Sequence, residues 1–395
     1  MVETSIKPTP SDVQILHVSI EPLPDLEALR VIWEELEQRS DGSFFQSWLW
    51  IGTWLACLPT HDECRVLSVA DPNRTLGLAI IGIRHVTRHG FVRTNNGYLN
   101  ESGDPHFDAL TIEHNGVLAD RTEMPQVLAA VVQFIDNAQP GWDEFHMSGV
   151  VEQHQLPPQQ VASARAKVIG VKPYFFVDLA ELRDTGQAYL QKLSSNTRSQ
   201  IRQTLKAYER IGPLLLREPK GVNEALEFLE RLKVLHNAYW TEKGGRGAFA
   251  TPFQNSFHQR LIEAGFEQQR IQLVRISAGE QDVGYLYNFV HAGRVCAYQS
   301  GFVYDVGDSK RRPGLVSHYL AVEHNMNAQQ QAYDFLAGDL RYKRSLSTHD
   351  GEMSWVAWQK PRLKFMLEDF LAEQKRRVRT WLTPKAMVKK KEEDA

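Results

Sequence analysis

Residues 295–302 read Val-Cys-Ala-Tyr-Gln-Ser-Gly-Phe, and after a polar loop the chain continues as Pro313-Gly314-Leu315. The first stretch predicts a strand. Proline is pre-organised for the first turn of a helix, so we expect a helix from Pro313 to about Gln330. Residues 332–337 predict a second strand, which breaks at Gly338. Strand, helix and strand in this order predict a parallel crossover, and ligands favour the carboxyl ends of such strands.

The start of the expected helix has the chemistry of an anion site. A helix N-terminus presents unpaired N–H groups and the positive end of the helix dipole, which suits a pyrophosphate. Gly314 allows close approach of the backbone, and Lys310, Arg311 and Arg312 add positive charge. The Gly-Lys-Ser/Thr run of a Walker motif is absent from this stretch. A pyrophosphate near Gly314 is the functional interpretation, and a helix start that binds nothing is the structural one.

The loop after the second strand is dense in ionisable groups. Asp339 is the first candidate for a general base or for positioning an acceptor, and Tyr342 for protonating a thiolate or orienting the acceptor. Lys343 is a candidate for holding a phosphate or carboxylate. Each has a structural alternative: Asp339 as a turn cap, Tyr342 as a core residue and Lys343 as a surface cation.

The two halves of the chain share an order of elements. Phe44-Phe45-Gln46-Ser47 resembles Pro252-Phe253-Gln254-Asn255, and each precedes an expected helix and then an apolar strand. Gly-started strands follow at Gly77 and Gly284, an offset of roughly 207 residues (284 − 77), which indicates a duplicated domain. The alternative is that common strand–turn–strand units align by chance. We expect domains at 12–165 and 166–385, divided near Pro157-Pro158, and a disordered tail at 386–395.

Composition narrows the class of protein. The chain has 395 residues, 42% hydrophobic and 24% charged, with a formal net charge of −3, so it gives no global attraction to DNA. Three cysteines without a CxxC pair and histidines without HExxH spacing predict neither a disulfide framework nor a metal site. The sequence contains neither an apolar run long enough to cross a membrane nor a secretory signal pattern, so a cytoplasmic location is expected.

Two expected helices carry further candidates. Between Ser194 and Gly212 a basic stripe recurs every four residues, and Arg198 and Arg202 begin it. The stripe favours contact with an anionic ligand as much as it favours a solvated helix face. On the helix expected at 225–240, His236 is a candidate proton carrier on the acceptor side, with Trp240 beside it as a substrate contact, although a lone helical histidine is more often structural.

The segment from about 190 to 358 resembles the BioF/CelD-like acetyltransferase family, a tandem branch of the GNAT fold related to the Fem peptidyltransferases. The resemblance rests on four runs in the order of that family: Leu193-Ser194-Ser195-Asn196-Thr197-Arg198, Tyr298-Gln299-Ser300-Gly301-Phe302, Pro313-Gly314-Leu315, and 334–339 with Tyr342-Lys343-Arg344.

This resemblance implies an α/β (α+β) fold of two tandem GNAT-like domains, each with a mixed central sheet flanked by helices. It also implies acetyl-CoA or another acyl-CoA as donor, with no metal. Tyr298, Gln299 and Ser300 would face the thioester, and Arg311, Arg312, Gly314 and Leu315 would hold the pyrophosphate. Many GNAT enzymes carry Gly-x-Gly or Gly-x-Ala where this chain has Arg-Arg-Pro-Gly-Leu.

Three functions remain open at this point. The first is N- or O-acyl transfer from acyl-CoA to a sugar, an amino acid or a cell-envelope precursor. The second is a Fem-like transfer from aminoacyl-tRNA, which is less favoured because an aromatic-rich basic RNA motif is absent. The third is a non-catalytic partner in polysaccharide assembly. The helix expected at 361–381 has apolar and basic residues that suit a partner or an anionic membrane surface, or else it covers the second core.

Overall fold

The structure is a computed structural model that describes residues 16–136, 141–154, 164–305 and 307–382. We call residues 16–154 the N half and residues 164–382 the C half. The Pro157-Pro158 stretch and the tail at 386–395 lie outside the described residues.

The N half consists of the following elements: β1 (His17–Pro22), α1 (Leu26–Gln38), η1 (Phe44–Gln46), α2 (Trp48–Cys57), β2 (Cys64–Ala70), β3 (Thr75–Arg88), β4 (Val92–Leu99), β5 (Leu118–Ala119), α3 (Met124–Asp136), β6 (Glu144–Val151) and η2 (Glu152–His154). The C half consists of the following elements: β7 (Arg165–Asp178), α4 (Leu179–Asp184), α5 (Tyr189–Lys192), α6 (Ser195–Glu209), β8 (Leu214–Arg217), α7 (Val222–Glu242), α8 (Pro252–Gly265), β9 (Ile271–Ala278), β10 (Gln281–His291), β11 (Arg294–Phe302), α9 (Pro313–Asn327), β12 (Ala332–Ala337), α10 (Arg341–Leu346), β13 (His349–Gln359) and α11 (Leu363–Leu382).

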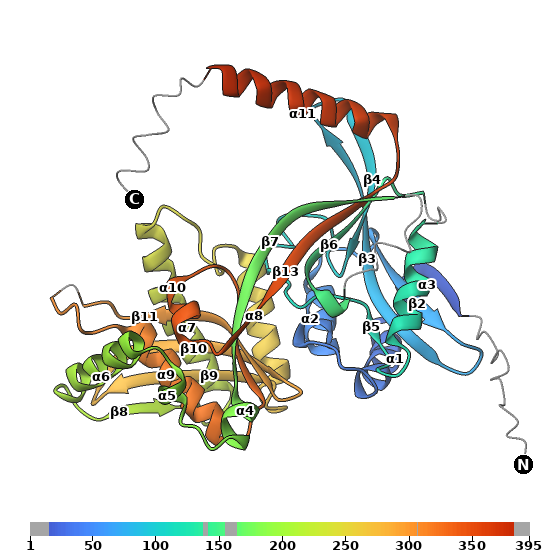
Figure 1. The fold of residues 1–395 in the computed structure, drawn as a ribbon. Coiled ribbons are helices and arrows are strands. Elements are labelled where there is room, and N and C mark those ends of the chain that lie inside the picture. Colours follow the sequence, from blue (N-terminus) through green and yellow to red (C-terminus); the bar gives the residue numbers. More distant parts are fainter. Residues whose placement is uncertain (1–15, 137–140, 155–163, 306, 383–395) are drawn as a thin grey trace, which may run out of the picture.

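The described strands form one continuous sheet that is nearly symmetric about its middle. Its order is β1-β2-β3-β4-β6-β13-β7-β12-β11-β10-β9-β8, and β5 pairs with β3. The order is the same from either end if β4 is matched with β11, β6 with β12, and β7 with β13. The last strand of the C half, β13, pairs with β6 of the N half, while β7 pairs with β12 and with β13. The long β7–β13 ribbon therefore joins the halves (Figure 1).

The repeated Phe-Gln element has a capping box in both halves, and it forms the 3-10 helix η1 before α2 in the N half and the first turn of α8 in the C half. Ser43 and Gln46 form a capping box before α2, and Thr251 and Gln254 form one at the start of α8. In each box the N-cap side chain bonds the N3 backbone, and the glutamine side chain bonds back to the N-cap backbone. The similar sequences thus mark equivalent helix starts.

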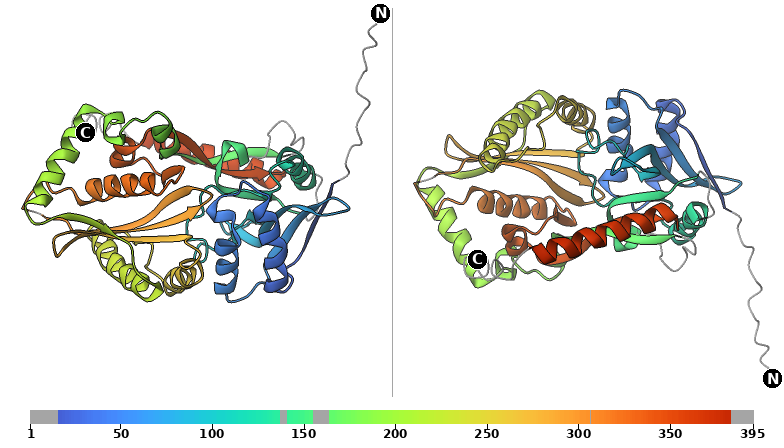
Figure 2. Two further views of the ribbon diagram at one scale, coloured as in Figure 1. Left: turned by 90° about the horizontal axis from the view of Figure 1, so that it is seen from below. Right: turned by 90° about the horizontal axis from the view of Figure 1, so that it is seen from above.

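The core holds the halves together. The ring of Phe44 stacks on that of Phe289 with centroids 4.3 Å apart, and Trp50 packs edge-on against Phe257 at 4.9 Å. These residues belong to one buried cluster with members from both halves. A second cluster lies within the C half, and a third consists of N-half residues together with Trp358 of β13. In the C half, α6 and α9 lie on one side of the strands and α7 and α8 on the other (Figure 2).

The local expectations from sequence agree with the structure at most elements. The strand, helix and strand of 295–337 are β11, α9 and β12, with β11 and β12 parallel, and Ser194 caps α6 through its side chain. The fold class of two GNAT-like units is confirmed, whereas the boundary at 165/166 stays a prediction. The helix at the C-terminal end does not cover the second core. Its contacts are with residues of β3, β4 and β7, because the β7–β13 ribbon carries it back to the N half.

Candidate active site

The strands β11 and β12 part in the middle of the C half. They pair at three positions only, which end at Cys296 and Asp334, although β11 runs on to Phe302 and β12 to Ala337. On its other edge β11 stays paired to β10, with a register shift that leaves Tyr298 as an extra residue. Such a bulge disrupts the ladder and re-aims backbone groups. We call this region of parting strands, which side chains fill, the C wedge.

The N-terminus of α9 lies beside β11 on one side of the C wedge. Its N-cap residue, Arg312, provides no side-chain cap, and Pro313 has no N–H, so the N–H groups of Gly314 and Leu315 have no intrahelical partner. A Cβ at position 314 would lie 3.1 Å from the Phe302 ring, so the glycine keeps the start of α9 close to β11. One guanidinium nitrogen of Arg312 is buried without a hydrogen-bond partner among the described residues. These features fit a bound pyrophosphate.

His318, one turn further along α9, lies between the parted strands. Its ring stacks on Tyr342 with centroids 5.2 Å apart and packs edge-on against Phe335 at 5.4 Å. Nδ1 is 3.1 Å from the Tyr333 hydroxyl, and within the described part of the chain Nε2 has no partner. Burial, with a smaller contribution from the Lys343 charge, lowers the pKa of His318 to about 3, so the ring is neutral. The sequence interpretation missed this residue, although its i+4 spacing from Gly314 puts both on one helix face.

A loop of the N half, residues 100–117, enters the C wedge from the opposite side. Tyr298 on β11 donates a hydrogen bond from its hydroxyl to the Leu110 carbonyl. Glu113 accepts a hydrogen bond from the Ala337 N–H on β12 at 2.8 Å through Oε2. The loop therefore contacts both strands where they part.

The Glu113 carboxyl is only 8% exposed. Burial raises its pKa above the ordinary value of 4.5, against opposing contributions from the Ala337 N–H, Lys343 and His114. A carboxyl with a raised pKa is suited to accept a proton near neutral pH. The sequence interpretation missed Glu113 because no local pattern links it to a strand more than two hundred residues later.

Buried ionic contacts fix this loop in place. Asp334 on β12 is fully buried and accepts hydrogen bonds from His114 Nε2 at 2.9 Å, from Arg294 at 2.7 Å and from the Leu336 N–H at 2.7 Å. Burial by itself would raise the pKa of Asp334, but His114 and Arg294 hold it below its ordinary value. Nearby, Lys343 donates from Nζ to the Leu336 carbonyl at 3.1 Å and to the Ala337 carbonyl at 2.6 Å.

The matching place in the N half, between β4 and β6, is filled by the same loop in another way. Here pairing ends at Tyr98 and His146, and we call the region beyond it the N wedge. Asn115, which is fully buried, donates from its backbone N–H to the Gly149 carbonyl on β6 at 3.0 Å. Its side-chain amide donates to the Leu99 carbonyl on β4 at 2.9 Å. Asn115 thus bonds both parted strands and closes the N wedge with backbone-like contacts.

The structure brings the residues expected to bind the donor to the C wedge, and their roles stay predictions. Ser300 accepts a hydrogen bond through its carbonyl from His236, and Gln299 is its neighbour on β11. Arg311 pairs with Asp305 and, at 3.6 Å, with Asp308 in the loop before α9.

The other predicted residues are more scattered. Asp339 is exposed and forms a bidentate ion pair with Arg344, with both oxygens at 2.5 Å. Both ring nitrogens of His236 are engaged, since Nδ1 bonds the Ser300 carbonyl at 3.0 Å and Nε2 accepts from the Ala248 N–H at 3.1 Å. That geometry leaves His236 no free nitrogen for proton transfer.

The residues expected to bind substrate also differ in setting. Lys343 is buried and committed to carbonyls, as above, rather than exposed. Arg198 donates to the Leu193 carbonyl at 2.6 Å, whereas Arg202 is exposed on α6. Trp240 is 40% exposed on α7. Arg198, the first residue of the basic stripe on α6, is therefore engaged in a hydrogen bond within the fold.

A cavity of about 910 Å³ lies away from the C wedge. It is bounded by α1, α2, α8 and the turn between β10 and β11, so it lies at the opposite end of β11. Arg270 on its wall pairs with Glu37 at 3.0 Å. Within the described ranges, no group of three or more His, Cys, Asp or Glu side chains is arranged to hold a metal ion.

A model of the acetyltransferase (GNAT) domain family matches residues 195–344, which include α9, the C wedge strands and α10. This part of the chain is similar to GNAT domains. No curated protein matches the chain in sequence.

Solved structures extend the fold comparison over the whole chain. The crystal structure of FemX aligns with a TM-score of 0.54 and 11% identity, covering 85% of this chain and 96% of that one. The C-terminal domain of a putative lysylphosphatidylglycerol synthetase from Agrobacterium fabrum aligns with a TM-score of 0.50 and 11% identity, covering 88% and 96%. At these identities the likeness shows the fold alone. The tandem GNAT, Fem-like architecture expected from the sequence is confirmed.

Proposed function

We propose that the chain is an acyltransferase whose C wedge takes an acyl-CoA donor and transfers the acyl group to an amine or hydroxyl. The observation that carries the proposal is the arrangement of the GNAT domain itself: two parallel strands part beside an uncapped helix N-terminus. Partial positive charge at the N–H groups of Gly314 and Leu315 suits the donor pyrophosphate, and the guanidinium of Arg312 adds a full charge. On this account the thioester lies between β11 and β12.

The chemistry needs a proton acceptor and a donor to the developing oxyanion. The acceptor nitrogen or oxygen attacks the thioester carbonyl carbon, the new C–N or C–O bond forms, and the C–S bond breaks to release the thiolate. Glu113 is our candidate to take the proton of the nucleophile, because it is buried, has a raised pKa and lies where the strands part. The bulge at Tyr298 directs backbone groups of β11 toward the carbonyl oxygen.

Asp334 acts through other residues. By bonding His114 of the loop and Arg294 of β11, it fixes the loop that carries Glu113. A catalytic group must be held within a fraction of an ångström, so these buried contacts are positioning contacts.

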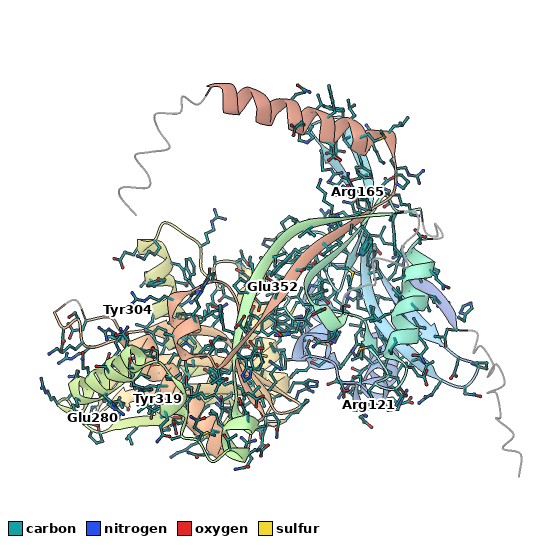
Figure 3. All side chains as sticks on the ribbon, in the orientation of Figure 1. Arg121, Arg165, Glu280, Tyr304, Tyr319 and Glu352 are labelled. Carbon is teal, nitrogen blue, oxygen red and sulfur yellow. The ribbon has the colours of Figure 1, made fainter. Side chains whose placement is uncertain are left out.

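Exposed aromatic side chains at the edge of the site support the expected class of acceptor. Tyr239 on α7 stacks on Tyr304, which follows β11 and is labelled in Figure 3, with centroids 5.7 Å apart. Trp240 lies edge-on to Tyr239 at 5.8 Å. These rings are 38%, 55% and 40% exposed respectively, and exposed aromatic faces suit a sugar ring or a base. A sugar, an amino acid or a cell-envelope precursor therefore stays the proposed acceptor.

The test follows the melting temperature while acetyl-CoA and longer acyl-CoAs are added to the full chain. A ligand at about 100 times its dissociation constant stabilises the folded state by roughly 2.7 kcal/mol. Gly314→Asp puts a negative charge where the pyrophosphate would lie, and we expect it to lose the shift. Gly314→Ala is the matched control, because it adds the same Cβ near Phe302 without the charge.

Absence of a shift with every CoA ester would remove the donor from the proposal. The alternative donor is then aminoacyl-tRNA, for which the exposed Arg202 on α6 is the relevant observation. Binding of charged tRNA should weaken steeply with added salt, because phosphate contacts release counterions. If the chain binds neither acyl-CoA nor charged tRNA, the remaining function is that of a non-catalytic partner in polysaccharide assembly.

A further inference from the structure

The helix α11 is attached to β3, to β7 and to Asp143 through a mostly polar face. Glu368 pairs with Arg88 at 3.0 Å, Asp369 pairs with Arg165 at 2.7 Å, and Lys364 pairs with Asp143 at 2.6 Å. Arg165 is labelled beneath this helix in Figure 3. The inward face of α11 is therefore held by ion pairs, with Phe365 packed among them.

The outward face of α11 is apolar. Its large side chains, with their exposed fractions, are Leu363 (83%), Met366 (68%), Leu367 (48%), Phe370 (58%) and Leu371 (38%). Helical spacing puts all five on one side, opposite the ion-paired residues. A surface helix of a soluble protein normally has the reverse arrangement, and a contiguous exposed apolar stripe marks an interaction surface. Seen from above, α11 lies along the outside of the molecule (Figure 2).

The sequence that follows these residues is rich in positive charge. Between 374 and 391 the chain has no Asp or Glu, and its cations are Lys375, Arg376, Arg377, Arg379, Lys385, Lys389, Lys390 and Lys391.

We propose that α11 lies in the surface of an anionic lipid bilayer, with its apolar face among the lipid head groups. An amphipathic helix with large apolar residues on one face and Lys or Arg around them binds such a surface by burial and by charge. No described helix is both long enough and apolar enough to cross a membrane, so the contact is peripheral.

The test is co-sedimentation of the full chain with vesicles of phosphatidylcholine alone and of phosphatidylcholine mixed with phosphatidylglycerol. We expect binding to the anionic vesicles only, and release by added salt. The double variant Met366→Glu/Phe370→Glu should weaken binding at least about tenfold, since it removes two apolar anchors. Because both side chains are exposed, the fold should survive. Val31→Glu on α1 is the matched control, since Val31 is 68% exposed, as Met366 is.

A second variant tests the charge. Changing Lys375, Arg376, Arg377 and Arg379 to Gln should reduce binding on the order of a thousandfold, because each cation near an anionic surface contributes about 1 kcal/mol. Equal binding to neutral vesicles, or no binding to either kind, would overturn the proposal. A dimer of the parent chain in size-exclusion chromatography would also overturn it, if the parent chain does not bind vesicles and the Met366→Glu/Phe370→Glu variant is a monomer.

Discussion

The N wedge and the C wedge lie between equivalent pairs of strands, but the same loop fills them with different side chains. In the N wedge, Asn115 bonds the carbonyls of both strands, and burial and the charge of Asp108 raise the pKa of the neighbouring Glu101. In the C wedge, Glu113 and His114 bond β12 while the strands stay apart. The same loop thus closes one wedge with an amide and places a carboxyl in the other.

The helices beside the two wedges, α3 and α9, differ in the charged residues that precede them. Before α9, Arg311 is paired with Asp305 and Asp308, and Lys310 and Arg312 are further cations. In the stretch before α3, Asp120 and Glu123 are acidic, and Asp120 is paired with Arg39 and Arg74. Positive charge next to a helix N-terminus favours an anion, and negative charge competes with it. The difference teaches that duplication of a fold does not duplicate its site. On our account the N half supports the site and provides one residue to it.

The largest expected effect is on turnover. Glu113→Gln keeps the shape and the hydrogen bond from the Ala337 N–H but cannot accept a proton, so we expect the rate of acyl transfer to fall about 10²–10⁴-fold. The donor-induced rise in melting temperature should remain, because the donor phosphates bind at α9. Steady-state kinetics and thermal unfolding of the same preparation provide both values.

Glu101→Gln in the N wedge is the matched control, and it should leave the rate unchanged. Equal losses for the two variants would break the distinction between the wedges. If Glu113→Gln were fully active, the proton would have to go elsewhere.

The second prediction concerns stability. Asn115→Ala leaves the Leu99 carbonyl, the Asn100 side chain and the Gly116 N–H without their buried partner. We expect the free energy of unfolding in urea to fall by about 2–4 kcal/mol, since buried groups lose their hydrogen bonds. A loss below the error of the measurement would mean that Asn115 does not close the N wedge.

The third prediction is a pH dependence. The pKa of Glu113 is raised, so the group becomes protonated and inactive as pH falls, and the rate should decrease through a midpoint above pH 4.5. In Glu113→Gln this limb of the profile should disappear. The sign for stability is opposite: ionising Glu113 in the fold is unfavourable, so its contribution to stability is lost as pH rises through the folded-state pKa.

The smallest expected effect is at the loop after β12. Asp339 is exposed and paired with Arg344, and an exposed ion pair contributes little. We expect Asp339→Asn to change the rate less than about twofold. A large loss of turnover with an unchanged donor shift would restore Asp339 as the base expected from the sequence, in place of Glu113.

The elements around the site could be predicted from the sequence because their signals are local. Pro313 and Gly314 mark the start of α9, and Ser194 marks the start of α6. The equivalence of the halves was also visible, since the capping residues recur with the Phe-Gln element.

The pairing of β13 with β6 and the reach of Glu113 and His114 across the halves could not be predicted in the same way. His114 bonds Asp334 over a separation of 220 residues, and such contacts depend on which strands pair rather than on any local pattern. For the same reason the position of Asp339 after β12 does not reveal its pairing with Arg344.

The central claim is that the chain has one donor site and that it lies in the C wedge. Calorimetric titration of acyl-CoA into the full chain measures this directly as a stoichiometry. The account predicts one donor per chain, with binding lost in Gly314→Asp and kept in Gly314→Ala and in Glu101→Gln. Two donors per chain, or binding that survives Gly314→Asp, would contradict it.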